Sequence, residues 1–255
     1  MPPAADPALL DEAVELAKAA GDLTLRWFRS VELAVDSKHD GTPVTEADKA
    51  AERLLREEIE GRYPDDAVHG EEEADKPGTS GRRWIIDPID GTKAFTHGVP
   101  LYSNLLAVED EQGIAVGVIN LPALREVVYA GRGLGCWCNG DPALVSEVDA
   151  LDEAYVTTSG FGGWPSGALE ALFEAGARVR TWGDGYGYAL VATGRVEAML
   201  DSVASPWDLA PVPVILEEAG GRFTSLDGKP GIDHGSGLGT NGKVHDALLE
   251  LYPSL

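Results

Sequence analysis

The first third of the chain carries apolar residues at helical spacing. In residues 6–28 they recur every three or four positions, and Asp6 stands before them in the place of a helix cap. A second such stretch covers residues 44–63, where Thr45 and Asp48 have the spacing of a capping box. The pattern therefore predicts two amphipathic helices in this part of the chain.

Further along the chain, short runs of β-forming residues alternate with turn signals. Between residues 82 and 140 these runs favour a strongly paired, largely antiparallel sheet. The later patterns predict strands over 153–160, 179–184 and 196–201, helices over 167–176, 186–194 and 207–220, and a hairpin over 221–228. We expect one compact unit with a layered α/β arrangement, with an N-terminal α+β half (about 1–145) and a C-terminal α/β half (about 146–255).

The composition is that of a globular protein, with 44% apolar residues among 255. Its longest apolar runs are far below the roughly 20 residues that span a bilayer, and the N-terminal stretch lacks a basic segment followed by an apolar core, so we expect a cytoplasmic protein. The 20 basic and 43 acidic residues give a net charge of -23, which argues against nucleic acid or an anionic membrane as partner. An anionic substrate would need local positive charge to be held.

The two cysteines, Cys136 and Cys138, are too close in sequence to bridge one another readily. A Cys-x-Cys pair can supply two metal ligands, but the sequence has no second Cys or His pair at zinc-type spacing. We therefore interpret them as ordinary strand cysteines.

The stretch WIIDPIDGT, residues 84–92, places two acids directly after an apolar run. Pro88 restricts the turn, and Gly91 allows a backbone angle that other residues resist. A rigid turn that holds Asp87 and Asp90 on one side suits a hard divalent cation, which prefers oxygen ligands. Such a cation would also supply the positive charge that an acidic protein lacks.

Other acids extend this group, although each has an ordinary explanation when taken alone. Asp48 can close the capping box, Glu71 in HGEEE can belong to a solvated loop, and Asp208 in SPWDLAP can cap the helix that follows it. If Glu71 and Asp208 approach the DPID turn, four carboxylates can share two or three Mg²⁺ ions.

The chain resembles the inositol monophosphatase superfamily of Mg²⁺-dependent phosphatases, in motif order and in spacing. The matching motifs are Lys38 with Asp40, PVTEAD (43–48), GEE (70–72), WIIDPIDGTKAF (84–95), GD-x-Y (183–186), LVATG (190–194) and PWDLAP (206–211). The resemblance implies the layered αβαβα sandwich of inositol monophosphatase and fructose-1,6-bisphosphatase, and a homodimer.

The resemblance also implies roles for particular residues. Glu71, Asp87 and the carbonyl of Ile89 look like ligands of one Mg²⁺. Asp87, Asp90 and Asp208 look like ligands of a second, and a weaker third would lie near Glu71. Thr92, supported by Asp48, resembles the pair that orients the attacking water together with Glu71, while the backbone of Gly91 and Thr92 would meet the phosphate. Mn²⁺ would fit the same oxygen ligands.

Substrate choice is expected in the segment TWGDGYGYALVATG (181–194). In the family, the equivalents of Gly183, Asp184 and Tyr186 line the substrate pocket, and the position of Asp201 holds an acid that contacts the leaving group. Asp184 and Asp201 can pair with the ammonium and imidazole of histidinol phosphate. The combination resembles the histidinol-phosphatase branch and predicts hydrolysis of L-histidinol phosphate to L-histidinol and phosphate.

Alternatives stay open at this point. Inositol 1-phosphate is the second candidate substrate, and other small esters follow. Asp184 can instead cap a helix starting at Gly185, Tyr186 can be a core residue, and Lys93 can contact phosphate or lie on the surface. A non-catalytic relative that binds metal or ligand is a hypothesis of another class, although Glu71, Asp87, Asp90, Thr92 and Asp208 are all present.

Overall fold

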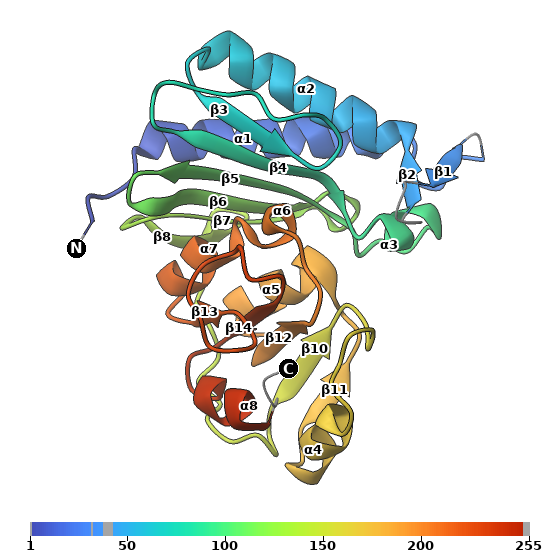
Figure 1. Ribbon diagram of the computed structural model, residues 1–255, viewed down its shortest axis with the longest axis vertical. Coiled ribbons are helices and arrows are strands. Elements are labelled where there is room, and N and C mark those ends of the chain that lie inside the picture. Colours follow the sequence, from blue (N-terminus) through green and yellow to red (C-terminus); the bar gives the residue numbers. More distant parts are fainter. Residues whose placement is uncertain (1, 32, 38–42, 252–255) are drawn as a thin grey trace.

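The computed structural model describes residues 2–31, 33–37 and 43–251, in which helices and sheets alternate in layers (Figure 1). The first layer holds helices α1 (Pro7–Thr24) and α2 (Glu46–Arg62). They cover one face of a seven-stranded sheet of order β3-β4-β5-β6-β7-β8-β9. Its strands are β3 (Ala67–Gly70), β4 (Arg83–Asp90), β5 (Ser103–Asp110), β6 (Gly113–Leu121), β7 (Glu126–Gly131), β8 (Gly135–Cys138) and β9 (Asp141–Pro142). Strand β3 runs parallel to β4, and the other neighbours are antiparallel.

The second sheet and its helices complete the layers. Helices α5 (Asp184–Ala192), α6 (Pro206–Leu209) and α7 (Val212–Glu218) lie between the two sheets (Figure 1). The second sheet has five strands in the order β11-β10-β12-β14-β13, namely β10 (Tyr155–Thr158), β11 (Arg178–Arg180), β12 (Ala198–Asp201), β13 (Arg222–Thr224) and β14 (Gly237–Thr240). Helices α4 (Ala168–Glu174) and α8 (His245–Leu251) cover its far side. The predicted αβαβα sandwich is confirmed.

Four short elements of the described residues lie outside the layers. They are the antiparallel pair β1 (Val35–Ser37) and β2 (Pro43–Thr45), the helix α3 (Thr92–Thr96) that follows β4, and the 3-10 turn η1 (Pro122–Leu124). Among the described residues, no helix combines the length and the apolar character needed to cross a bilayer.

The hydrophobic core divides along the layers, and strand β4 shows how. Trp84 and Ile86 belong to the buried cluster beneath α1 and α2, whereas Ile85 belongs to the cluster shared with α5 and α7. This alternation follows from the two-residue repeat of a strand. Asp87, two residues after Ile85, therefore faces the middle helical layer, from which α6 approaches.

The local helix signals predicted the first layer correctly. Asp6 caps α1 and accepts a hydrogen bond from the amide of Ala8 at 2.9 Å. Thr45 and Asp48 form the expected capping box of α2. The two cysteines lie in strand β8 as ordinary strand residues.

Two predictions for the C-terminal half are wrong. The single helix over 207–220 is divided into α6 and α7, because Pro211 and Pro213 lack the amide hydrogens that a continuous helix needs. The hairpin over 221–228 does not form, since β13 pairs instead with β14. Strand β14 contains Gly239, where a Cβ atom would stand 2.6 Å from Leu216 Cδ1. Close packing therefore requires glycine at this position, and the β-branched residues that usually indicate a strand are absent there.

His245 gives the fold a predicted sensitivity to acid. The fully buried ring hydrogen-bonds the hydroxyls of Thr240 (2.9 Å) and Thr224 (3.0 Å), and burial, followed by the charge of Arg222, lowers its pKa to about 4. The unfolded chain, with an ordinary histidine pKa of about 6.5, binds the extra proton first as the pH falls. Stability from this group is therefore present above about pH 6.5 and decreases towards pH 4, by about 3 kcal/mol in all.

Urea unfolding of the metal-free protein and of His245→Gln between pH 4 and 7 measures this contribution. Other titrating groups contribute to both proteins, so the difference between the two unfolding free energies isolates His245. We expect that difference to shrink as the pH falls from 6.5 to 4. A difference that does not change with pH would contradict the assignment.

Candidate active site

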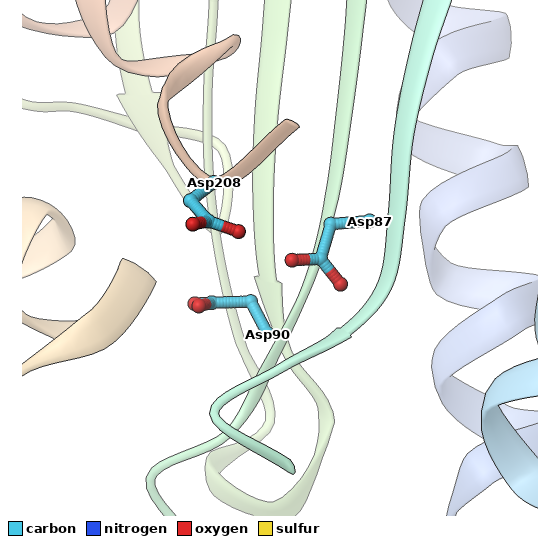
Figure 2. A group of neighbouring side chains, drawn as sticks. All are labelled: Asp87, Asp90 and Asp208. Atoms are coloured by element: carbon cyan, nitrogen blue, oxygen red, sulfur yellow. The ribbon is translucent and has the colours of Figure 1, made fainter. Parts of the chain in front are cut away.

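Three aspartates from two distant segments meet at the end of strand β4. Asp87 and Asp90 close the strand, and Asp208 lies in the first turn of α6. One oxygen from each carboxylate lies within 4.8 Å of the other two, and the side chains point toward one another (Figure 2). Asp87 is 2% exposed and Asp90 is 8% exposed. The expected convergence of Asp208 with the DPID turn is therefore present.

A bulge in β4 directs both acids of that strand to the same side. The register with β5 shifts between Asp87 and Asp90. The Asn104 side-chain amide donates to the carbonyl of Pro88 at 2.6 Å, and the Asn104 side-chain oxygen accepts from Asn120 at 3.0 Å. Without such a bulge, residues three apart would face opposite sides of the sheet.

The turn after the bulge depends on Gly91. Its φ of 79° lies in the left-handed region, as the sequence predicted, and it precedes the short helix α3. Ile89 is fully buried in a cluster with the rings of Phe95 and Tyr102, whose centroids are 4.8 Å apart. The turn is thus fixed by the left-handed backbone at Gly91 and by the packing of Ile89 against the two aromatic rings.

Hydrogen bonds orient the carboxylates of the cluster. Asp90 Oδ2 accepts from the Ser103 hydroxyl at 2.7 Å and from the amide of Gly185 at 2.5 Å. Asp208 Oδ2 accepts from the amide of Ser205 at 2.7 Å and closes a capping box. The prediction that Asp208 caps a helix starting at Leu209 is wrong, because Asp208 is the third residue of α6 and closes a capping box with Ser205. This bond engages one of the two carboxylate oxygens.

The electrostatics of the cluster favour a bound cation. Burial, followed by the charge of Glu71, raises the pKa of Asp87 well above its usual value. Burial and then Asp184 do the same to the pKa of Asp90, while burial, opposed by the Ser205 amide and reinforced by Glu71, raises the pKa of Asp208 to about 6. Close buried carboxylates resist joint ionisation unless a positive charge stands between them. The donor set, carboxylates only, fits a hard divalent metal ion.

A cavity of about 920 Å³ opens onto the cluster and brings most predicted site residues together. It is large enough for a small phosphate ester. The predicted residues that line it are Glu71, Asp87, Ile89, Asp90, Gly91, Thr92, Gly183, Asp184, Asp201 and Asp208. Lys93, for which the sequence left phosphate contact and surface exposure open, is exposed and also lines the cavity.

Asp184 and Asp201 lie in this cavity and are linked through Ser159. The Ser159 hydroxyl donates to Asp201 Oδ1 at 2.6 Å and accepts from the amide of Asp184 at 2.8 Å. Burial is the main cause that raises both pKa values, for Asp201 to about 7. Sequence reasoning missed Ser159, although its place just after the parallel strand β10 is a signal for a ligand-binding position.

The backbone around Asp184 is strained. Its φ of 56° is uncommon for a residue other than glycine, and such strain is typical of functional sites. Asp184 is the first residue of α5, with Gly183 at the N-cap position, and among the described residues no backbone amide donates to the Asp184 carboxylate. The alternative that Asp184 caps a helix is therefore wrong. At Gly183, a Cβ atom would stand 2.1 Å from Ser159 Cα, so only glycine permits this approach.

Asp48 and Thr92 form different hydrogen bonds from those of the predicted pair. Asp48 is fully buried, and its Oδ2 accepts from the amide of Thr45 at 2.8 Å, whereas Oδ1 has no hydrogen-bond partner among the described residues. The Thr92 hydroxyl donates to the carbonyl of Ile89 at 3.0 Å. Burial is the main cause that raises the Asp48 pKa, and the charge of Glu71 adds to it. The joint role of Asp48 and Thr92 stays a prediction.

Three other motif residues lie away from the cavity lining or outside the description. Tyr186 is half-buried against the hydrophobic cluster of the middle layer and does not line the cavity, so its substrate role also stays a prediction. Lys38 and Asp40 lie outside the described residues.

Comparisons with known proteins agree with this geometry. The chain matches the inositol monophosphatase family over residues 6–254. It is 47% identical to a histidinol-phosphatase of Chlorobaculum parvum over 90% of both chains, and 41% identical to one of Mycobacterium tuberculosis over 93% of this chain and 95% of that protein. The solved structure of a Thermotoga maritima inositol monophosphatase superposes with a TM-score of 0.88 at 32% identity, over 96% of both chains. The chain belongs to the inositol monophosphatase family.

Proposed function

We propose that the protein hydrolyses L-histidinol phosphate to L-histidinol and phosphate, in a reaction that depends on Mg²⁺. Members of its family are phosphoric monoester hydrolases, and so is this chain. The observation that carries the choice of substrate is the pair Asp184 and Asp201, two carboxylates that line the same cavity as the aspartate cluster. A leaving group with positive charge suits that wall of the cavity.

The metal would be held by the carboxylates already described. Glu71, Asp87 and the carbonyl of Ile89 would bind one Mg²⁺, and Asp87, Asp90 and Asp208 a second, with a third near Glu71. When bound, these ions supply positive charge for the phosphoryl oxygens and lower the pKa of water. Mn²⁺ suits the same oxygen donors.

The chain itself positions water and substrate. Because the Thr92 hydroxyl donates its hydrogen bond to the Ile89 carbonyl, the hydroxyl oxygen is left to accept a hydrogen bond from the attacking water. Glu71, which also lines the cavity, would accept a proton from that water. The water oxygen attacks phosphorus, and the bond to the histidinol oxygen breaks with its electron pair left on that oxygen. The histidinol oxygen takes up a proton from a solvent water, and Glu71 returns its proton to solvent. The amides of Gly91 and Thr92, at the start of α3, would donate to the phosphate.

The leaving group would be held by charge. Its ammonium and imidazole can donate charge-assisted hydrogen bonds to Asp184 and Asp201. Ser159 holds Asp201 and the backbone of Asp184 in fixed relation, so the two carboxylates are arranged before the substrate binds.

A kinetic comparison of two esters tests the proposal. Phosphate release is measured with histidinol phosphate and with myo-inositol 1-phosphate, each with and without Mg²⁺. We expect a higher kcat/KM for histidinol phosphate and no turnover without metal. A preference for the inositol ester would refute the choice of substrate, and no release from either ester would refute the enzyme assignment.

Asp184→Ala is expected to raise KM for histidinol phosphate by roughly 10- to 100-fold, the value of a hydrogen bond to a charged group. The effect on myo-inositol 1-phosphate should be much smaller, because its leaving group carries no positive charge that would lose its partner. Steady-state kinetics with both esters measure this, and Asp184→Asn, which keeps the shape without the charge, is the matched variant. Equal effects on both esters would remove the cation-pairing idea.

The family resemblance further implies a cytoplasmic homodimer, and this part of the proposal stays a prediction.

A further inference from the structure

The buried ion pair of Glu52 and Arg56 in helix α2 forms hydrogen bonds with the backbone just after Glu71. Glu52 is fully buried, and its carboxylate accepts from the amide of Glu72 at 2.8 Å and from the amide of Glu73 at 3.1 Å. Arg56 Nε donates to Glu52 Oε1 at 2.8 Å, and its Nη2 donates to the carbonyl of Glu73 at 3.1 Å. Together Glu52 and Arg56 bind two backbone amides and one backbone carbonyl of the loop that follows β3. We call this pair the α2 clamp.

Gly70 makes room for the α2 clamp on the other side of Glu71. A Cβ atom at Gly70 would stand 2.2 Å from Glu52 Oε1 and 2.9 Å from Arg56 Nη2. The last residue of β3 therefore lies directly against the two charged groups. Glu71 is held between a glycine that contacts the clamp and two peptide groups bound by it.

The clamp ties Glu71 to the same helix that carries Asp48. Asp48 lies one helical turn before Glu52, and α2 is anchored on the sheet by the fully buried Ile59 and by Leu55. On the side before Glu71, the ring of His69 packs 5.4 Å from the ring of Trp207, which precedes Asp208. The loop of Glu71 is thus fixed both to α2 and to the segment of Asp208.

Stability alone does not explain this arrangement. Two buried charges lose much of their attraction to the cost of desolvation, so an apolar pair of similar volume would stabilise the helix as well. What apolar residues cannot do is accept two amide hydrogens and donate to a carbonyl at the edge of the site. Groups that orient metal ligands in this way commonly set metal affinity.

We propose that Glu52 is a positioning residue for Glu71: with Arg56 it fixes the peptide groups after Glu71, so that the Glu71 carboxylate is held beside Asp87 and Asp208. This inference rests on the proposed metal site, because Glu71 is there a metal ligand. The charge of Glu71 contributes to the raised pKa values of Asp87 and Asp208, which is consistent with a Glu71 side chain close to both.

The test compares Glu52→Gln with Asp66→Asn by isothermal titration calorimetry of Mg²⁺ in the absence of substrate. Asp66 is a matched control, since it is a buried carboxylate bound to Arg82 (3.1 Å) and to the Trp84 indole (2.9 Å), but it lies before the start of β3. Glu52→Gln should weaken Mg²⁺ binding about 10-fold or more, and Asp66→Asn by less than twofold. Hydrogen exchange of the Glu72 and Glu73 amides should become faster in Glu52→Gln alone.

Gly70→Ala offers a second route, because it keeps the Glu52 carboxylate and displaces it. It should also weaken Mg²⁺ binding, even if Glu52→Gln fails to fold. In Glu52→Gln and in Gly70→Ala, the turnover of histidinol phosphate and that of myo-inositol 1-phosphate should fall by the same factor. Unchanged Mg²⁺ affinity in a folded clamp variant whose amides exchange faster would overturn the proposal. An unmodified protein that binds no Mg²⁺ would instead overturn the proposed metal site, and the clamp proposal with it.

Discussion

Asp90→Asn is expected to lower kcat on the order of 10²- to 10³-fold or more, the cost of removing a group that stabilises charge in the transition state. The change keeps the shape of the side chain and removes only its charge. The Ser103 hydroxyl and the Gly185 amide both donate to Asp90 Oδ2, so an asparagine that places its carbonyl oxygen there keeps both hydrogen bonds. The expected loss therefore lies in metal binding and transition-state stabilisation rather than in packing.

Steady-state kinetics of phosphate release measure this loss, over a range of Mg²⁺ concentrations. Asp110→Asn is a suitable control, because Asp110 is bonded to Arg132 at a distance from the cavity lining. It should retain kcat within twofold. Near-normal turnover by Asp90→Asn at ordinary Mg²⁺ would refute the assignment of Asp90 as a metal ligand.

In the metal-free protein, the buried aspartates of the site are expected to contribute less stability as the pH rises from 4 to 7. Burial is the main cause that raises the pKa of Asp201 to about 7 and of Asp208 to about 6, above the ordinary value near 3.8. The folded protein therefore binds extra protons, so this contribution is fully present below pH 3.8 and is lost as the pH rises through 6 to 7. Mg²⁺ would bind the ionised carboxylate of Asp208 and should restore the part of the stability that this group loses.

Melting curves with Mg²⁺ and with EDTA at pH 5 and pH 8 measure this effect. At 100 times its dissociation constant, Mg²⁺ contributes about 2.7 kcal/mol, or roughly 5–10 °C in Tm for a chain of this size. We expect a shift of that size at pH 8 and a much smaller one at pH 5. The His245 contribution is common to both conditions at each pH and cancels in the difference. Equal shifts at both pH values would be inconsistent with a raised carboxylate pKa.

The sequence predicted the parts of the fold that local rules decide. The helices α1 and α2 follow from apolar periodicity and from the caps Asp6 and Thr45, which act within a few residues. Strand β14 was missed because Gly237 and Gly239 pack closely against the middle layer, which leaves no strand-forming side chains to detect at these two positions. Pro211 and Pro213 indicated a break between α6 and α7, but the helical pattern of the apolar residues around them led to the prediction of a single helix.

The site was predicted unevenly for a related reason. Asp87 and Asp90 share a turn, so their proximity is local, whereas the approach of Asp208 depends on how α6 packs between the sheets. The hydrogen bond of Thr92 to Ile89, and the Asp48 oxygen that lacks a partner within the described part of the chain, are details of side-chain geometry that spacing does not encode. Glu52 was missed because a charged residue in an amphipathic helix is usually solvated, and only the structure shows it buried.

The most direct test is a crystal structure of the protein with Mn²⁺, histidinol and phosphate, in which anomalous scattering locates the metal. We expect metal peaks among Asp87, Asp90, Asp208 and Glu71, phosphate beside Gly91 and Thr92, and the histidinol ammonium within hydrogen-bond distance of Asp184 or Asp201. Metal at these carboxylates with histidinol turned away from both Asp184 and Asp201 would contradict the choice of substrate. Metal bound elsewhere would contradict the site itself.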